Sequence, residues 1–225
     1  KKLFLGELAL DGKIRPIKGA LSLAKAAKQK GFEEIYLPSA NAKEAGLIRD
    51  IKIFACNNLK EVAEHLEEKI NFNLAESPET EIVFEEQFFN TDFQEIKGQE
   101  TAKRGLEIAA AGGHNLLMVG PPGTGKTMLA KAFTAILPPL SFEEILETTA
   151  IHSVAGILEG DFLTTRPLRS PHHTSSYVAI VGGGNYPKPG EITLSHRGVL
   201  LLDEFPEFEK RVIESLRQPL EDGSI

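Results

Sequence analysis

The most constraining feature of this sequence is a glycine-rich stretch at residues 120–127, which fits the phosphate-loop pattern G-x-x-x-x-G-K-[ST]. Glycines can adopt positive φ, so the backbone N–H groups of such a loop can turn inward toward phosphate oxygens. Lys126 is expected to reach the β- and γ-phosphates of a nucleotide, and the Thr127 hydroxyl to bind Mg²⁺. The residues expected to contact nucleotide are Gly120, Pro121, Pro122, Gly123, Thr124, Gly125, Lys126, Thr127 and Met128.

The flanking residues have the pattern that a true phosphate loop requires. An apolar run at 115–119 predicts a buried strand before the loop, and residues 127–136 predict a helix after it, closed by Pro138 and Pro139. A strand, loop and helix in this order are typical of an α/β P-loop NTPase, a doubly wound parallel sheet with its ligand at the carboxyl ends of the strands.

A second stretch, Val199 to Glu204, reads Val-Leu-Leu-Leu-Asp-Glu and predicts an apolar strand that ends in two carboxylates. Alone, this pattern is common and often structural. Beside a phosphate loop, it predicts that Asp203 helps to hold Mg²⁺ and that Glu204 polarises the attacking water. The two stretches together predict a chain that binds ATP with Mg²⁺ and hydrolyses it, with Lys126 and Glu204 as its catalytic residues.

Composition agrees with an ordinary globular protein, and charge marks a boundary. The chain has 225 residues, 41% hydrophobic residues and a net charge of −7. No apolar run is long enough to cross a membrane, and the single cysteine, Cys56, excludes an internal disulfide. A cytoplasmic location is therefore expected. Residues 73–91 are strongly acidic and predict a linker between a domain at 1–72 and a domain at 92–225.

Residues 162–190 contain no acidic residue, which is unusual in a chain of this net charge. This segment holds Arg166, Arg169, His172, His173 and Lys188. One interpretation is a loop that contacts a nucleic-acid backbone. The alternatives are local ion pairs of Arg166 or Arg169, or an arginine that senses the nucleotide of a neighbouring subunit. The adjacent histidines lack the acidic or cysteine companions that a metal site needs. Tyr177 and Tyr186 are expected to pack in the core rather than stack on bases.

Longer motifs resemble those of a known family. The residues that carry the resemblance are Ile96-Lys97-Gly98-Gln99, the phosphate loop, Ile151 to Gly156, Arg166 to Thr174, Val181 to Gly184, Pro189 to Ile192 and Gly198 to Glu204. In these the chain resembles AAA+ ATPases of the magnesium-chelatase-related group, of the ComM/YifB type. The strings Arg-Ser-Pro-His-His and Val-Gly-Gly-Gly are the most specific, because many ATPases share the phosphate loop.

The resemblance implies an ATP-driven motor that forms a hexameric ring and acts as a DNA helicase in branch migration, recombination or transformation. It implies that Ile96 and Gly98 line the adenine pocket. It also implies that the sensor residue, arginine finger and helical lid of such ATPases lie beyond Ile225, so we expect a fragment with weak hydrolysis of its own. Two other functions remain open: a chelatase-type ATPase that remodels a protein for metal insertion, and a nucleotide-gated assembly module.

Residues 1–72 resemble part of a Lon-protease-like domain of the ribosomal S5 domain 2-like type. The strings Gly6 to Gly12 and Leu37 to Asn41 carry this likeness. Leu21 stands where the protease pattern needs its lysine, so proteolysis is not expected. The alternation of short strands and helices before residue 72 predicts a small α/β layer. Asn58 with Glu61 predicts a capped helix there, and Ser141 with Glu144 predicts a capping box for a later helix. A helix is also expected at 99–111 and a strand at 177–181.

Overall fold

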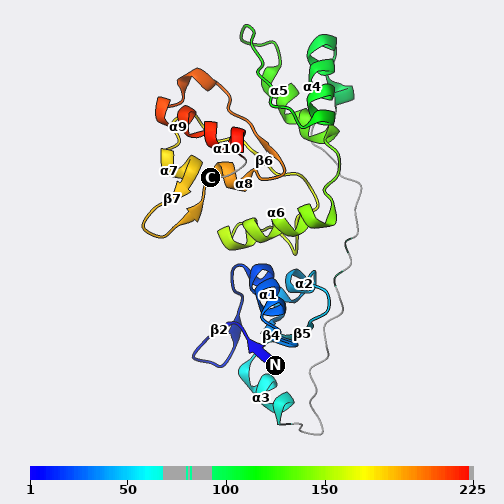
Figure 1. Ribbon diagram of the computed structural model, residues 1–225, viewed down its shortest axis with the longest axis vertical. Helices are drawn as coiled ribbons and strands as arrows, with labels where there is room; N and C mark the ends of the chain where they lie inside the picture. Colours follow the sequence, from blue (N-terminus) through cyan, green and yellow to red (C-terminus); the bar gives the residue numbers. More distant parts are fainter. Residues whose placement is uncertain (68–79, 81, 83–92, 223–225) are drawn as a thin grey trace. The chain divides into compact units, whose positions relative to one another are not determined.

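The computed structural model describes residues 1–67, 80, 82 and 93–222. The chain forms two compact units, coloured along the sequence in Figure 1, and each combines two stretches of chain. The first unit comprises Lys1–Val83 and Ile145–Leu163, and the second comprises Phe84–Glu144 and Thr164–Ile225. Apart from Thr80 and Ile82, the predicted acidic linker at 73–91 lies outside the described residues.

A parallel sheet organises the first unit. Its strands are β1 (Lys2–Phe4), β4 (Glu34–Pro38) and β5 (Lys52–Cys56), in the order β1-β4-β5. In the register, Ile35 pairs with Leu3 on one side and with Ile53 on the other. A second, antiparallel pair joins β2 (Glu7–Leu8) to β3 (Ile14–Arg15). The predicted small α/β layer is confirmed.

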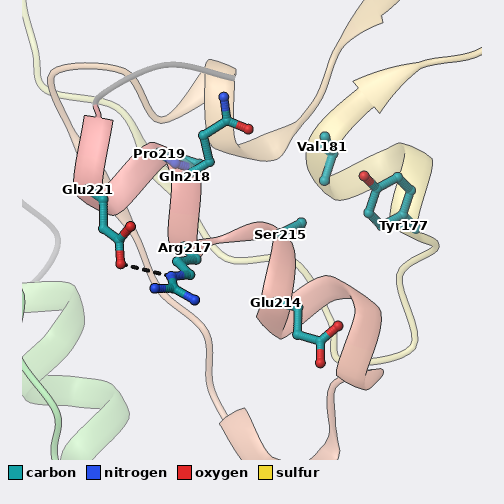
Figure 2. A pocket seen from close by; sticks show the side chains of 8 residues that line it. All are labelled: Tyr177, Val181, Glu214, Ser215, Arg217, Gln218, Pro219 and Glu221. Carbon is teal, nitrogen blue, oxygen red and sulfur yellow. Dashed lines mark hydrogen bonds and ion pairs between the residues drawn. The ribbon is translucent and has the colours of Figure 1, made fainter.

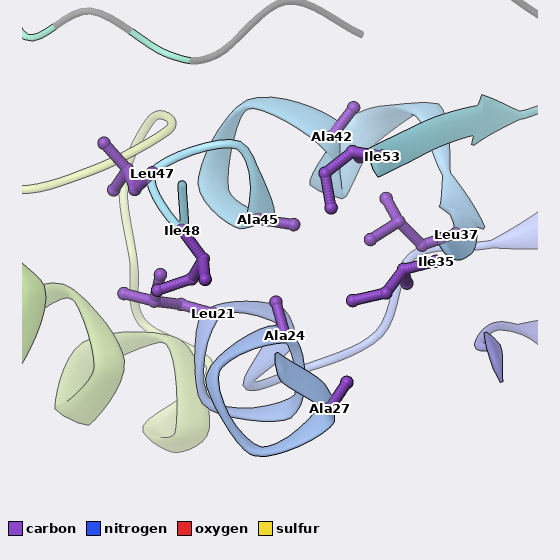
Figure 3. Packing of buried hydrophobic residues seen from close by; sticks show 10 residues of the cluster. All are labelled: Leu21, Ala24, Ala27, Ile35, Leu37, Ala42, Ala45, Leu47, Ile48 and Ile53. Atoms are coloured by element: carbon purple, nitrogen blue, oxygen red, sulfur yellow. The ribbon is translucent and has the colours of Figure 1, made fainter. Parts of the chain in front are cut away.

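Helices cover this sheet (Figure 1): α1 (Ala20–Gln29), the 3-10 turn η1 (Ser39–Asn41), α2 (Ala42–Ala45) and α3 (Leu59–Leu66). Figure 3 shows Ala24 and Ala27 of α1 on the side of Ile35, and Leu21 beside Ile48, within one apolar cluster. Ile35 and Leu37 are fully buried there. Burial of each such side chain contributes about 1.5–3 kcal/mol. The predicted cap of α3 is confirmed, since Glu61 N donates to Asn58 Oδ1 at 2.9 Å.

Residues 145–163 pack with the first unit, although the predicted ATPase region, 92–225, includes them. They carry most of α6 (Phe142–Ala155). Leu146, Ala150 and Phe162 pack against the α1 core, and Gly19 N donates to Ser153 Oγ at 2.8 Å. Ser141 and Glu144 form the predicted capping box at the start of α6, with bonds of 3.0 and 3.3 Å. The predicted domain boundaries themselves stay a prediction.

The second unit has two groups of elements. The first group comprises η2 (Phe93–Glu95), α4 (Glu100–Gly112), α5 (Lys126–Ala132) and η3 (Phe133–Ile136). Ile96, Leu106, Leu129 and Ala132 form its core. The helices predicted before and after the phosphate loop are therefore present, although the second ends in the 3-10 turn η3.

The second group surrounds a short parallel pair, β6 (Leu168–Arg169) with β9 (Val199–Leu200). A hairpin of β7 (Gly182–Gly183) and β8 (Lys188–Pro189) lies between α7 (Tyr177–Val181) and α8 (Glu191–Leu194). The chain continues through η4 (Phe205–Glu207), α9 (Lys210–Ser215) and α10 (Arg217–Asp222). Ile180, Phe208 and Val212 form the core of this group.

The strand predicted at 177–181 is wrong, because this segment is helix α7. Ser176 caps it, and its Oγ accepts a hydrogen bond from Ala179 N at 3.2 Å. A short apolar run cannot be assigned to strand or helix by its periodicity alone, and here the cap favours a helix.

The strand predicted at 115–119 is also absent from the described structure. Leu117 is 76% exposed and Val119 is 88% exposed, so this apolar run gains no partner strand that would bury it. In the described part of the second unit, parallel pairing is limited to β6 and β9. The chain is therefore a mixed α/β protein with parallel sheet pieces, and the described residues do not contain the predicted doubly wound sheet. None of the helices in the described ranges has the length and apolar character that crossing a bilayer requires.

Candidate nucleotide-binding site

The phosphate loop lies directly before α5 and has the backbone that its glycines predict. Gly123 has φ 79° and Gly125 has φ 83°, both in the left-handed region that L side chains rarely adopt. Gly125 is the residue before the first helical residue, Lys126. A Cβ at Gly123 would meet no atom within 4 Å, so this turn is open on that side. The loop therefore presents bare backbone to solvent at the point where the motif predicts phosphate.

The side chains of the loop hold its shape. Lys126 Nζ donates to the carbonyl oxygens of Gly120 and Pro121, both at 2.9 Å. Thr124 Oγ1 donates to the Pro121 carbonyl oxygen at 3.0 Å. These bonds close the loop into a compact ring and place the ammonium group of Lys126 directly over it.

The carboxylate of Asp203 meets the phosphate-loop helix. Thr127 Oγ1, on α5, donates to Asp203 Oδ2 at 2.7 Å, although the two residues lie 76 positions apart. Asp203 follows the carboxyl end of β9. The pairing of β9 with β6 fixes the position of this strand end. The two sequence patterns therefore meet at one place in the second unit, with a hydroxyl and a carboxylate side by side.

Gln99 is a site residue that the sequence did not single out. It precedes α4 and has φ 58°. Its Nε2 donates to the Thr124 carbonyl oxygen at 3.3 Å, so it supports the phosphate loop from the side. The available signal was its place in the Ile96 to Gln99 motif. Ile96 itself is buried in the core against α4 and α5, and Gly98 has φ 71° in the turn before α4. Both residues belong to the turn before α4, which ends at Gln99, the residue that contacts the loop.

Glu204 also has a partner that the sequence did not predict. Its backbone is left-handed, with φ 55° and ψ 42°, and its side chain is 66% exposed. His173 Nδ1 lies 3.1 Å from Glu204 Oε2. The ring centroid of His173 lies 4.1 Å from that of His172, with the rings tilted by 36°, and 6.5 Å from that of Phe208, which it meets edge-on. The histidine pair is therefore part of the candidate site rather than a separate feature.

The two arginines of the acid-free segment are engaged locally. Arg166 donates to the carbonyl oxygens of Pro138 and Arg197, both at 2.6 Å, and its Nη2 lies 3.2 Å from Glu144 Oε2. Arg169 donates to both oxygens of Glu191, at 2.6 and 2.8 Å, and this hydrogen bonding raises the pKa of its guanidinium. These contacts agree with the alternative of local ion pairs. They leave the guanidinium groups little capacity to bind a polymer.

The β7–β8 hairpin presents a different surface. Tyr186 is 87% exposed, so the expectation that it packs in the core is wrong. Lys188 is exposed on the same hairpin. Tyr177 is partly buried beside the Ile180 core, with Arg211 lying 4.1 Å over its ring, so the expectation is confirmed for this tyrosine. Across the described residues, no group of three or more His, Cys, Asp or Glu side chains could hold a metal ion.

A cavity of about 460 Å³ lies among α7, α9 and α10 (Figure 2). Its wall includes Tyr177, Val181, Glu214 and Arg217, and Arg217 Nε donates to Glu221 Oε1 at 2.9 Å. None of the residues predicted to bind nucleotide lines it. The candidate site is instead the exposed meeting point of the phosphate loop, Asp203 and Glu204.

The sequence was also compared with known proteins. The profile of the family described as "Magnesium chelatase, subunit ChlI" matches residues 92–225, and a second profile, "Subunit ChlI of Mg-chelatase", matches residues 1–41. The chain belongs to the magnesium chelatase ChlI family. This confirms the predicted resemblance. The family is one of AAA+ ATPases with a P-loop fold, so membership supports nucleotide binding and an ATPase-type function.

Curated relatives match nearly the whole chain. It is 48% identical over 98% of its length to the uncharacterized protein YifB of Salmonella typhimurium, and 46% identical over 99% to the competence protein ComM of Haemophilus influenzae. It covers 43% and 44% of these proteins, so the chain spans less than half of their length. It is also 28% identical over 59% of its length to Lon protease 2 of Bacillus subtilis, of which it covers 26%.

Proposed function

We propose that this chain binds ATP with Mg²⁺ between the phosphate loop and the acidic end of β9, and hydrolyses it. The observation that carries this proposal is the 2.7 Å contact between Thr127 Oγ1 and Asp203 Oδ2. It joins the two sequence patterns that, in a P-loop ATPase, serve the same nucleotide. Family membership supports the same activity.

The residues present fit a magnesium ion and a triphosphate. Thr127 and Asp203 bring a hydroxyl oxygen and a carboxylate oxygen together, and oxygen donors of this kind suit Mg²⁺. These two residues would hold the ion, which would neutralise charge that develops on the phosphates. Gly123 and Gly125 leave the loop backbone free of side chains, and the Lys126 ammonium lies over the loop, where it can bind phosphate oxygens.

Glu204 is the proposed general base. An exposed carboxylate directly after Asp203 can accept a proton from a water molecule that attacks the terminal phosphate. Hydrolysis also needs this carboxylate to stay within hydrogen-bond reach of the water.

We also propose that the full-length protein assembles into a hexameric ring and moves on DNA as a helicase or branch-migration factor. The Haemophilus relative is named a competence protein, which supports a role with DNA. The β7–β8 hairpin is the proposed contact, because Tyr186 and Lys188 are exposed there. Aromatic rings stack on bases, and a lysine pairs with phosphates. Arg166 and Arg169 are less suited, because their donors serve their own unit.

A second candidate function is a chelatase-type ATPase that remodels a partner protein for metal insertion. The description of the matched family supports it. The third possibility, a nucleotide-gated assembly module, would bind ATP with little turnover. These alternatives predict no ATP-dependent affinity for DNA, so a single binding experiment separates them from the motor.

The test uses the full-length protein and labelled forked or single-stranded DNA. We expect ATP-dependent binding that weakens as salt rises, since phosphate contacts release counterions. Lys126→Ala should abolish both ATP binding and ATP-dependent DNA binding. Tyr186→Ala with Lys188→Ala should weaken DNA binding while ATP affinity, measured by calorimetry, is unchanged. A ring that ignores DNA at low salt would exclude the motor, and Lys126→Ala with undiminished ATP affinity would exclude the site.

A further inference from the structure

The acid-free segment reaches the candidate site through one side chain, His173. Its Nδ1 lies 3.1 Å from Glu204 Oε2. Nδ1 is thus the ring atom that faces the carboxylate, whose oxygens can only accept a hydrogen bond. The sequence suggested contact with DNA for this histidine and did not predict a carboxylate partner.

The pairing of β6 with β9 explains why these two residues meet. Leu168 is in register with Val199, and Arg169 with Leu200. His173 and Glu204 each lie four residues beyond the second of these pairs, at the same height along parallel segments. Arg169 O also accepts a hydrogen bond from Leu201 N at 2.8 Å, which extends the pairing toward the site. The contact is thus a consequence of strand register and not of a chance approach of two long side chains.

The surroundings hold the histidine ring more firmly than the carboxylate. His173 is only 27% exposed, against 66% for Glu204, and its ring contacts His172 and the buried Phe208. His172 is in turn fixed by Thr174, whose Oγ1 lies 2.9 Å from His172 Nδ1. An exposed glutamate side chain otherwise samples several rotamers.

The backbone of Glu204 points to the same conclusion. A non-glycine residue with φ 55° is uncommon, and such a conformation persists where surrounding contacts enforce it. Two backbone contacts do so here: Glu204 N donates to Asp203 Oδ1 at 3.0 Å, and Glu207 N donates to Glu204 O at 2.8 Å. They fix the Glu204 backbone, and within the described part of the chain the contact with His173 restrains its carboxylate.

We propose that His173 is a positioning residue that holds the Glu204 carboxylate in the place from which it acts on water. The proposal rests on the proposed ATPase function and deepens it. His173 touches neither nucleotide nor water in this role. A misplacement of a catalytic group by about 1 Å can lower a rate by roughly 100-fold, so a single restraint of this kind has a measurable effect on turnover.

The experiment compares three variants of the full-length protein in steady-state ATP hydrolysis. His173→Phe keeps a ring against His172 and Phe208 but removes the N–H donor. His173→Asn restores a donor on a shorter side chain. His65→Phe is the matched control, because it makes the same exchange at a histidine of the first unit, whose ring packs against Tyr36 and Phe54. Circular dichroism and the unfolding midpoint show whether each variant is folded.

We expect His173→Phe to lower kcat about 10- to 100-fold, with KM and the ATP affinity unchanged. His173→Asn should recover much of the loss, and His65→Phe should stay within about twofold of the wild-type rate. In a Glu204→Gln background, His173→Phe should cause no further loss, because the two residues act as one unit. The imidazole nitrogen resonances of His173 should shift in Glu204→Gln, which reports the contact without any turnover.

A His173→Phe rate equal to or above that of the wild type would overturn the inference, as would a loss confined to KM. If the wild-type protein binds ATP but does not hydrolyse it, the proposed function itself fails, and this inference fails with it. If the wild type hydrolyses ATP and the His173 variants hydrolyse it at the same rate, the proposed function survives and the role of His173 does not.

Discussion

Two apolar segments of the chain, at 34–38 and 115–119, differ strongly in burial. Ile35 and Leu37 on β4 are fully buried, because β1 and β5 pair with that strand on both sides and α1 covers it. In the run at 115–119, Leu117 and Val119 are largely exposed, and the described chain supplies no neighbouring strand. An apolar pattern therefore predicts the tendency to form a strand, whereas burial depends on partners from elsewhere in the chain.

The same contrast separates the roles of the two units. The first unit buries its apolar side chains around a sheet, and its few buried polar groups are paired within it: the Glu44 carboxylate accepts from Leu21 N at 2.9 Å. The second unit instead brings exposed polar groups together at the phosphate loop and β9. We therefore expect substitutions in the first unit to change stability, and those at the candidate site to change chemistry.

The largest expected effect tests the chemical half of this contrast. Glu204→Gln should lower the rate of ATP hydrolysis by roughly 10²–10⁴-fold, because the amide cannot accept the proton from water. ATP affinity by calorimetry and the unfolding midpoint should both stay unchanged. An undiminished rate of phosphate release would move the general base to another residue.

The next effect tests the structural half with a matched pair. Ile35→Ala should lower the free energy of unfolding by about 2–5 kcal/mol, because it opens a cavity in a closed core. Val119→Ala should change it by less than about 0.5 kcal/mol, as exposed substitutions usually do. Denaturant titrations measure both. A large loss in Val119→Ala would show that further chain covers this run in the protein as it exists.

A smaller effect is expected where the second unit uses an ion pair for structure. Arg166→Ala removes the donor to the carbonyl oxygens of Pro138 and Arg197 and one of the cations beside Glu144, which should lower the free energy of unfolding by about 1–3 kcal/mol. Arg166→Lys should recover only part of the lost stability, because an ammonium group cannot reproduce the several planar hydrogen bonds of a guanidinium. DNA affinity should not change. A specific loss of DNA affinity in a stably folded Arg166→Ala protein would show that this arginine contacts nucleic acid.

The smallest effect concerns Cys56 in the buried part of the first unit. Burial raises the pKa of its thiol to about 11 from an ordinary value of 9.0. The folded state therefore favours the protonated thiol. The stability that this proton contributes is fully present below about pH 9 and is lost as the pH rises toward 11. Thiol titration with a chromogenic disulfide should give slow modification of the native protein at pH 8 and fast modification after unfolding. Fast native modification would contradict the burial.

Local patterns predicted local structure well. The cap of α3 by Asn58, the capping box of Ser141 and Glu144, and the helices around the phosphate loop are all present. Each depends on hydrogen bonds or backbone preferences within three or four residues. The strand predicted at 177–181 is wrong because Ser176, a cap, outweighs the β-propensity of the apolar run after it.

The motifs predicted only the part of the site that their own residues form. The motifs place Thr127 and Asp203 at one nucleotide, and the structure brings them within 2.7 Å across 76 positions of sequence. No motif indicated that Gln99 supports the loop, that His173 contacts Glu204, or that Tyr186 is exposed. These depend on which side chains approach from distant segments, and periodicity carries no information about that.

The sequence by itself determined the phosphate loop, the carboxylates that face it, and the glycines that give the loop its positive φ, because backbone geometry and ligand chemistry are set by residues close together in the chain. Only the tertiary structure decided that Arg166 and Arg169 pair within their own unit and that residues 145–163 pack with the first unit. It also decided that a histidine restrains Glu204. Hydrogen-bond donors bind the nearest acceptor in space, and spatial proximity here follows from strand register and core packing between distant segments.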